Sequence, residues 1–308
     1  MSLQHFLRLG HYTPEALQAL LASSAALRTQ RHSKSLPQLL SGRTMGMIFQ
    51  KRSTRTRVST EAGVALLGGH AVFLGKEDIQ LGVNESVQDT AQVLSRFHDV
   101  VLARVFKHSD VEELAKHSTV PIINGLSDLH HPLQALADLL TIQQHFPVTK
   151  GLKIAWVGDG NNVLHSLLET APKMQMHISV ATPPGYLPNA TIVKEAQADA
   201  ARYGTRVELT NNPREAVKGA NVIVTDTWIS MGDEAQKEER LRSFAGFQVT
   251  NELLKHASPD WKFLHCLPRK PEEVSDEVFR SPRSLVWDEA ENRMYTVMAV
   301  ILDLLKLR

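Results

Sequence analysis

Residues 45–66 read MGMIFQKRSTRTRVSTEAGVAL, and the character of the chain changes twice within this stretch. Residues 45–49 form an apolar run that predicts a buried strand, and the end of the stretch predicts a helix. Between them, residues 51–57 carry four cations and three hydroxyls. Because a helix N-terminus offers N–H groups and a positive dipole end, we expect a phosphate-binding turn here. A solvated loop with Ser53 or Thr54 as a plain N-cap is the alternative.

The helix after this turn is expected over residues 55–67. Its predicted apolar face consists of four residues at helical spacing, namely Val58, Ala62, Ala65 and Leu66.

Strand-like and helix-like segments alternate along the whole chain. After a capped amphipathic helix at 14–27, strands are expected at 45–49, 71–74, 100–105 and 120–124, and helices at 55–67, 86–97, 110–117 and 131–146. The alternation restarts with strands at 153–157, 178–181, 206–209, 221–225 and 263–265, and with helices ending at 168, at 190–203 and at 289–305. This pattern predicts the α/β class with two Rossmann-like domains, each a parallel sheet flanked by helices, joined by interdomain helices.

The composition is that of an ordinary soluble globular protein, and a length of 308 residues favours two domains. A formal net charge of +1 argues against nucleic acid as a partner. One cysteine, Cys266, permits no intrachain disulfide and favours a reducing compartment. We find no apolar run of membrane-spanning length and no signal or lipidation pattern, so we expect no membrane partner and a cytoplasmic location.

The glycine-rich stretch at residues 158–162 reads GDGNN and follows an expected strand. Val163 occupies the place of the third glycine of a dinucleotide fingerprint, and the next strand ends without an acid, so we reject NAD binding. The glycines still permit close approach of a ligand, and Asn162 could hydrogen-bond it. A tight turn with an asparagine cap is the alternative.

Three further motifs stand at the carboxyl ends of expected strands, where open parallel sheets bind ligands. His131 begins a helix, and Gln134 follows one turn later on the same face. The carboxylate of Asp226 could bind a substrate ammonium group. The alternative is that Asp226 forms an ordinary Asx-turn. His265 and Cys266 point to opposite faces of their strand, so His265 is not the base for Cys266. No metal-ligand spacing surrounds the thiol, and by pattern alone Cys266 is a buried, inert cysteine.

Two isolated arginines, and the absence of a nucleotide-binding motif, also bear on the chemistry. Arg104 stands in an otherwise apolar strand, where a charge needs a partner, whereas Arg293 alone would be a surface charge. No G-x-x-x-x-G-K-[ST] sequence is present, which disfavours a kinase. These residues favour an enzyme with an oxyanion site in its first domain, phosphoryl or phosphate-leaving chemistry, and a second substrate near Asp226 and Cys266.

Taken together and in order, the motifs resemble those of the ornithine carbamoyltransferases in the aspartate/ornithine carbamoyltransferase superfamily. The stretches that carry the resemblance are STRTR at 53–57, LGVNES at 81–86, NGLSD at 124–128, HPLQ at 131–134, Asp226 with SMG at 230–232, and HCLPR at 265–269. The resemblance implies transfer of a carbamoyl group from carbamoyl phosphate to the side-chain amine of L-ornithine. The products are citrulline and phosphate, as in arginine biosynthesis, and neither a metal nor an organic cofactor is needed.

The resemblance also implies domains and residue roles. A carbamoyl-phosphate-binding domain is expected at 1–147, an ornithine-binding domain at 148–285, and a C-terminal helix at 286–308 that packs back on the first. Carbamoyl phosphate would be bound by Ser53, Thr54, Arg55, Thr56, Gln80, Arg104, His131, Gln134, Cys266, Leu267 and Arg293. Ornithine would be bound by Asn162, Asp226, Ser230 and Met231. The residues expected to be catalytic are Arg104 and His131, facing the developing oxyanion, and Asp226 and Cys266, near the reacting amine.

Assembly is implied in the same way. Gln80 stands where the family reaches into a neighbouring subunit, so we expect a homotrimer with shared active sites. The loop at 230–232 is expected to close over ornithine. Arg57 lies deeper in its helix than the other residues of the turn and is expected to brace the loop or a neighbouring carboxylate.

Several rival functions stay open from the sequence. Sister enzymes act on aspartate, putrescine or an acylated ornithine, and Cys266 with Asp226 argues against the aspartate type. Catabolic ornithine carbamoyltransferases share these motifs. A non-enzymatic role as a lens protein or toxin-binding module is the remaining alternative.

Overall fold

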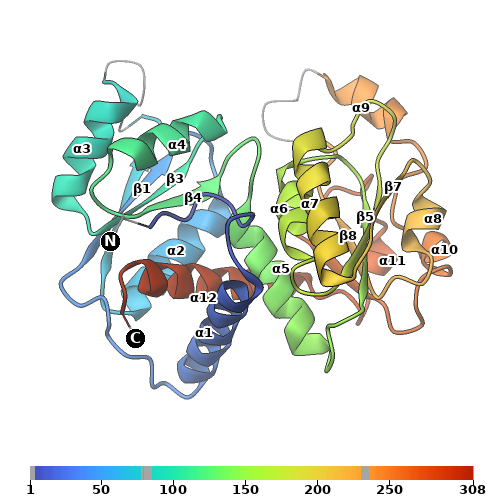
Figure 1. Ribbon diagram of the computed structural model, residues 1–308, viewed down its shortest axis with the longest axis horizontal. Helices are drawn as coiled ribbons and strands as arrows, with labels where there is room; N and C mark the ends of the chain where they lie inside the picture. Colours follow the sequence, from blue (N-terminus) through green and yellow to red (C-terminus); the bar gives the residue numbers. More distant parts are fainter. Residues whose placement is uncertain (1–3, 78, 80–84, 230–235, 308) are drawn as a thin grey trace. The chain divides into compact units, whose positions relative to one another are not determined.

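The computed structural model describes residues 4–77, 79, 85–229 and 236–307. The expected site residues Gln80, Ser230 and Met231 therefore lie outside the described residues. The chain divides into two compact units, the first comprising Met1–Leu140 and Glu291–Arg308 and the second Thr141–Ala290. Each unit contains one parallel sheet with helices on both faces, which confirms the predicted fold class (Figure 1). Among the described residues, no helix has the length and apolarity that a membrane span requires.

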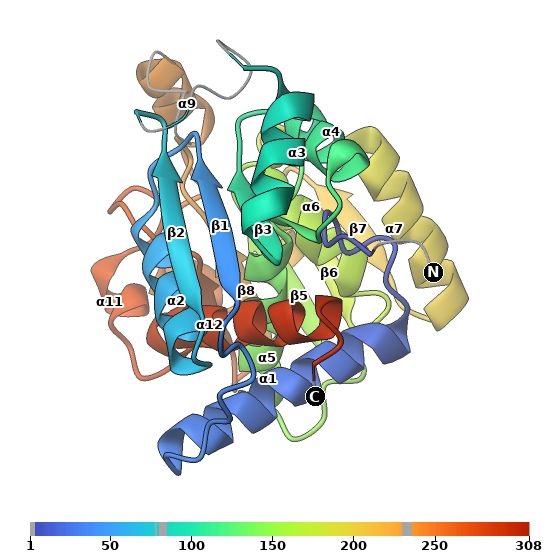
Figure 2. The same ribbon diagram turned by 90° about the vertical axis from the view of Figure 1, so that its left-hand side faces the viewer.

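The first unit is built on a four-stranded sheet in the order β2-β1-β3-β4. Its strands are β1 (Thr44–Phe49), β2 (His70–Gly75), β3 (Val100–Arg104) and β4 (Ile122–Leu126). Its helices are α1 (Pro14–His32), α2 (Thr54–Leu66), α3 (Val87–Phe97), α4 (His108–His117), the start of α5 (Pro132–His145) and most of α12 (Val286–Leu304). Helices α3 and α4 cover one face of this sheet, and α2 and α12 lie on the other (Figures 1 and 2).

The second unit is built on a five-stranded parallel sheet in the order β7-β6-β5-β8-β9. Its strands are β5 (Lys153–Val157), β6 (His177–Ala181), β7 (Val207–Thr210), β8 (Val222–Thr225) and β9 (Lys262–His265). Its helices are α6 (Asn162–Thr170), α7 (Ala190–Tyr203), α8 (Pro213–Val217), α9 (Lys237–Ser243), α10 (Asn251–Leu254) and α11 (Asp276–Phe279). Helices α6 and α7 lie side by side on one face (Figure 1). A large apolar core lies on the other face.

Most predicted elements are confirmed with small boundary differences. Thr13 caps α1 as expected, because its Oγ1 accepts the N–H of Ala16 at 3.2 Å. The short helices α8 to α11 were not predicted, since each is too brief to show a helical period.

The predicted apolar face of α2 is wrong. Val58 is 56% exposed, and the buried face instead consists of Thr56, Thr60, Gly63 and Val64. A Cβ on Gly63 would lie only 2.8 Å from Cγ of Met298 in α12. Close approach of two helices therefore selects small residues for the buried side, which a count of large apolar residues does not detect.

Both sheets reverse their strand order at one point. In the first unit the chain proceeds from β1 to β2 on one side and then to β3 on the other, and β5 stands between β6 and β8 in the same way. The carboxyl ends of strands that flank such a reversal diverge and leave a crevice for ligands. The fold thus places the loops after β1 and β3, and those after β5 and β8, at two ligand-binding positions.

Candidate active site

The cationic turn after β1 forms the N-terminus of α2. Ser53 is the N-cap, and its Oγ accepts the N–H of Thr56 at 3.2 Å. A helix N-terminus presents backbone N–H groups and a positive dipole end, so the first turn of α2, with Thr54 and Arg55, suits an anion. A cavity of about 920 Å³ lies at this end of α2, and its lining includes Phe49, Arg52, Ser53, Thr54 and Phe73.

Three arginines surround His131 in the first unit. His131 is 6% exposed, and burial together with the charges of Arg293, Arg104 and Arg55 holds its pKa well below the ordinary value. Arg104 ends β3 and Arg293 lies in α12, and both are buried. Arg293 donates from Nη2 to Oγ1 of Thr56 at 3.2 Å, which links α12 to the first turn of α2. Segments far apart in sequence thus bring these cations to one place.

The low pKa means that His131 is a neutral imidazole at neutral pH, with one N–H donor and one acceptor nitrogen. A tight turn positions it: Ser127 donates its N–H to the carbonyl of His130 at 3.0 Å, and His130 donates its N–H to Ser127 Oγ at 3.2 Å. Gln134 follows in α5, where its amide nitrogen donates to Asp138 at 2.8 Å. This arrangement can offer neutral and cationic donors to one developing oxyanion.

The pKa of His131 predicts how stability depends on pH. A histidine whose folded pKa lies below its unfolded value of 6.5 binds its proton more readily when unfolded. The free energy of unfolding therefore falls as the pH drops below that value, by at most about 1.4 kcal/mol per pH unit for one histidine. We expect His131→Gln to lose less stability than the wild type between about pH 7 and about pH 5.5 in urea unfolding. Equal losses in both proteins would contradict the prediction.

Arg57 lines the same cavity at the N-terminus of α2, and its guanidinium group is engaged by two neighbouring side chains. Its Nε lies 3.1 Å from Oε1 of Glu61, and its guanidinium carbon lies 3.6 Å from the centre of the Phe73 ring. The expectation that Arg57 braces a neighbouring carboxylate is confirmed.

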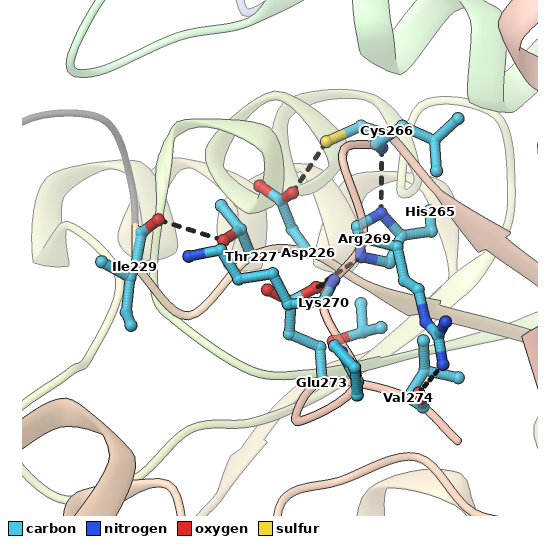
Figure 3. Close-up of polar contacts among 12 residues, drawn as sticks. Asp226, Thr227, Ile229, His265, Cys266, Arg269, Lys270, Glu273 and Val274 are labelled. Carbon is cyan, nitrogen blue, oxygen red and sulfur yellow. Dashed lines mark hydrogen bonds and ion pairs between the residues drawn. The ribbon is translucent and has the colours of Figure 1, made fainter. Parts of the chain in front are cut away.

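The second unit places a thiol against a carboxylate. Asp226 follows β8 and is 6% exposed, and Cys266 follows β9. The thiol of Cys266 donates to Oδ1 of Asp226 at 2.8 Å (Figure 3). Cys266 is half-buried, so the expectation of a buried cysteine is wrong, and its thiol is hydrogen-bonded to a carboxylate.

Both ring nitrogens of His265 are hydrogen-bonded to groups other than the Cys266 thiol, and one of them fixes the segment that follows. Its Nδ1 accepts the N–H of Leu267 at 2.9 Å, so Nε2 carries the proton and donates to Glu273 at 3.0 Å (Figure 3). The side chains of His265 and Glu273 are both fully buried. The prediction that His265 is not the base for Cys266 is confirmed.

The same residues do not form a metal site. One ligand atom each from Asp226, His265 and Cys266 lies within 4.8 Å of the others. However, one ring nitrogen of His265 accepts a backbone N–H and the other bonds Glu273. Because no nitrogen of His265 is left for a cation, we assign no metal here.

Comparisons with known proteins agree with this geometry. The carbamoyl-P binding domain of the aspartate/ornithine carbamoyltransferases matches residues 4–144, and their Asp/Orn binding domain matches residues 150–304. The chain belongs to the aspartate/ornithine carbamoyltransferase family. Ornithine transcarbamylase, mitochondrial, of Gallus gallus is 56% identical over 97% of this chain and 85% of its own length.

Solved structures of the family superpose closely on this chain. Ornithine carbamoyltransferase from Pyrococcus furiosus has a TM-score of 0.95 at 49% identity, covering 97% of this chain and 96% of that one. Anabolic ornithine carbamoyltransferase from Campylobacter jejuni subsp. jejuni has a TM-score of 0.92 at 38% identity, covering 98% of each chain.

The expected site residues that the structure describes are divided between the two units of the chain. The first unit holds Ser53, Thr54, Arg55, Thr56, Arg104, His131, Gln134 and Arg293. The second unit holds Asn162, Asp226, Cys266 and Leu267. In the first group, the structure brings His131 close to Arg55, Arg104 and Arg293. In the second group, it brings the thiol of Cys266 to the carboxylate of Asp226.

The loop between β5 and α6 contains contacts that the sequence analysis missed. Arg240 in α9 donates from Nη1 to Oδ2 of Asp159 at 3.0 Å and to the carbonyl of Trp228 at 2.8 Å. Asn161 donates from Nδ2 to Oδ2 of Asp226 at 2.8 Å. The available signal was an asparagine directly before a helix, which is the favoured N-cap position. The contacts of Arg240 with Asp159 and of Asn161 with Asp226 join residues distant in sequence, so no local pattern predicts them.

Gly160 in this loop admits no side chain. A Cβ there would lie 2.3 Å from the backbone nitrogen of Pro188. We expect Gly160→Ala to lower the free energy of unfolding by about 3 kcal/mol in urea titration, because backbone must move. Gly204 is the matched control, since it has a φ of +70° and open space around its Cβ position. Gly204→Ala should cost about 1 kcal/mol, and equal losses would contradict this assignment.

Proposed function

We propose that this chain transfers the carbamoyl group of carbamoyl phosphate to the side-chain amine of L-ornithine, giving L-citrulline and phosphate. The observation that carries the choice of amine substrate is the carboxylate of Asp226 bonded to the thiol of Cys266 at 2.8 Å. This pair offers a negative charge and a proton acceptor, which suit an ammonium group that must lose a proton before it attacks.

The first unit supplies the binding of carbamoyl phosphate. The N-terminus of α2, with Ser53, Thr54, Arg55 and Thr56, fits a phosphate group because its N–H donors and cation are complementary to negative charge. Arg104 and the neutral His131 serve as donors to the carbonyl oxygen, which becomes an oxyanion when the amine adds. Gln134 and Arg293 are the remaining proposed contacts of this unit.

The second unit supplies the binding of ornithine. Asp226 and Cys266 hold the reacting amine, and Asn162, Ser230 and Met231 are the remaining proposed contacts. An alkylamine has an ordinary pKa of about 10.4, so most of it is protonated near neutral pH. Removal from water and a nearby acceptor both help the amine to lose its proton. The neutral amine attacks the carbonyl carbon, and the bond from that carbon to the phosphate oxygen then breaks.

We further propose a homotrimer in which Gln80 of one subunit completes the carbamoyl-phosphate site of its neighbour. Two inactive variants, Arg55→Ala and Gln80→Ala, should then regain activity when their subunits are mixed and reassociated. Some mixed sites would contain neither substitution. Light scattering should give the mass of three chains. Recovery of no activity from a reassociated mixture would contradict the shared site.

The substrate is tested with a panel of amines. Purified protein, carbamoyl phosphate and equal concentrations of ornithine, putrescine, N-acetylornithine or aspartate are compared by initial rate of phosphate release. We expect kcat/KM to be highest for ornithine. A preference for putrescine or N-acetylornithine would move the assignment to a sister enzyme, and no transfer to any amine would favour a non-enzymatic role.

We propose a cytoplasmic location, a reducing compartment in which Cys266 stays the free thiol that the proposed chemistry needs. Cell fractionation tests this location. Activity found in an organelle fraction alone would contradict it.

A further inference from the structure

The fold determines which end of the Asn161 side-chain amide faces Asp226. Asn161 is the N-cap of α6, and its Oδ1 accepts the N–H groups of Val163 at 3.0 Å and Leu164 at 3.2 Å. Because Oδ1 is bound to two backbone donors, the amide cannot turn over. The Nδ2 group must therefore face Asp226, whose Oδ2 lies 2.8 Å away.

Asp226 is thereby held through both of its oxygens. Oδ2 accepts from Asn161 at 2.8 Å, and Oδ1 accepts the thiol of Cys266 at the same distance. With the amide in place, the carboxylate plane is fixed and Oδ1 remains the oxygen that meets the thiol. Without it, the carboxylate could rotate, and either oxygen could leave the reacting position.

The loop that carries Asn161 is itself anchored. The carbonyl of Asp159 accepts the N–H of Asn161 and the indole N–H of Trp156, both at 2.9 Å. The carboxylate of Asp159 is bonded to the buried Arg240 at 3.0 Å. Gly160 donates its N–H to the carbonyl of Tyr186 at 3.0 Å. These bonds hold the backbone of Asn161 in place, so the amide reaches Asp226 without a change in the loop.

From this arrangement we propose that Asn161 is a positioning residue for carbamoyl transfer, acting through Asp226. The proposal rests on the proposed function and adds a residue that the family resemblance did not supply. One polar side chain performs two separable tasks, since Oδ1 caps α6 and Nδ2 aligns Asp226.

Two variants separate these tasks. Serine and aspartate are both good N-caps, so Asn161→Ser and Asn161→Asp keep the acceptor for α6 and lose the donor to Asp226. We expect Asn161→Ser to lower kcat by about 10²-fold while KM for ornithine changes by less than about threefold. Asn161→Asp brings a second carboxylate against Asp226, and two adjacent carboxylates do not both ionise readily. The acidic limb of its pH profile for kcat should therefore move to higher pH, which loss of a cap alone would not cause.

Asn189 provides the matched control in the same unit. It is the N-cap of α7, and its Oδ1 accepts the N–H groups of Thr191 at 3.0 Å and Ile192 at 3.3 Å. Asn189→Ser and Asn189→Asp should keep kcat and its pH profile within about twofold of the wild type.

The experiment measures citrulline formation across pH for the wild type and the four variants. A wild type that forms no citrulline would overturn the proposed function and this inference together. An active wild type with Asn161→Ser within about twofold of its kcat would overturn the inference alone. If Asn161→Ser does not fold, Asn161→Asp tests the inference instead. An acidic limb of its pH profile for kcat that matches the wild type would overturn the inference.

Discussion

Replacing Asp226 with asparagine should lower kcat for ornithine by about 10³-fold, within the range seen when a positioned proton acceptor is lost. The variant keeps the shape of the side chain but removes its negative charge and replaces one acceptor oxygen with a donor. The thiol of Cys266 or the amide of Asn161 then faces an N–H group instead of a carboxylate oxygen. The measurement is the initial rate of citrulline formation with both substrates saturating.

Asp260→Asn is the matched control for this substitution. Asp260 is an exposed aspartate of the same unit and is bonded to Ser258 at the protein surface. Its variant should retain wild-type kcat and KM. If Asp226→Asn also turned over ornithine at the wild-type rate, Asp226 would have no part in the reaction.

Replacing Arg55 with alanine should lower kcat/KM for carbamoyl phosphate by about 10²- to 10³-fold. Arg55 stands in the first turn of α2, and its charge contributes to the low pKa of His131. Its loss removes a cation from the proposed phosphate site and from the neighbourhood of the proposed oxyanion. Urea unfolding of the variant should stay close to that of the wild type, because Arg55 is only half-buried.

Arg57→Ala tests the same helix two residues further on. Because Arg57 is engaged with Glu61 and Phe73, its loss should lower kcat/KM by less than about tenfold. Arg206→Ala is a surface control, since that side chain is 72% exposed, and it should behave as wild type. A larger loss from Arg57→Ala than from Arg55→Ala would reverse the assignment of the two arginines.

The fold could be predicted from sequence because its signals are local. An apolar run such as residues 45–49 or 153–157 is long enough to mark a buried strand, and Thr13 before Pro14 marks a helix start. The prediction was wrong where the buried face of a helix depends on the residues that pack against it. The buried face of α2 depends on Met298 in α12, a residue more than two hundred positions away from Gly63.

The candidate site divides in the same way. The cationic turn at 51–57 and the positions of Asp226 and Cys266 at strand ends are visible in the sequence. The roles of Arg104 and Arg293 were suggested only by family resemblance, because each is an isolated charge in the sequence. Contacts such as that between Asn161 and Asp226 depend on β5 and β8 being neighbours, and strand order leaves no local trace.

The central claim is that this chain joins the carbamoyl group of carbamoyl phosphate to ornithine. Its most direct test follows carbon-labelled carbamoyl phosphate in the presence of purified protein and L-ornithine. We predict that label appears in citrulline and that phosphate is released in an equimolar amount, only when ornithine is present. Phosphate release that is independent of ornithine, or label that never enters citrulline, would contradict the account.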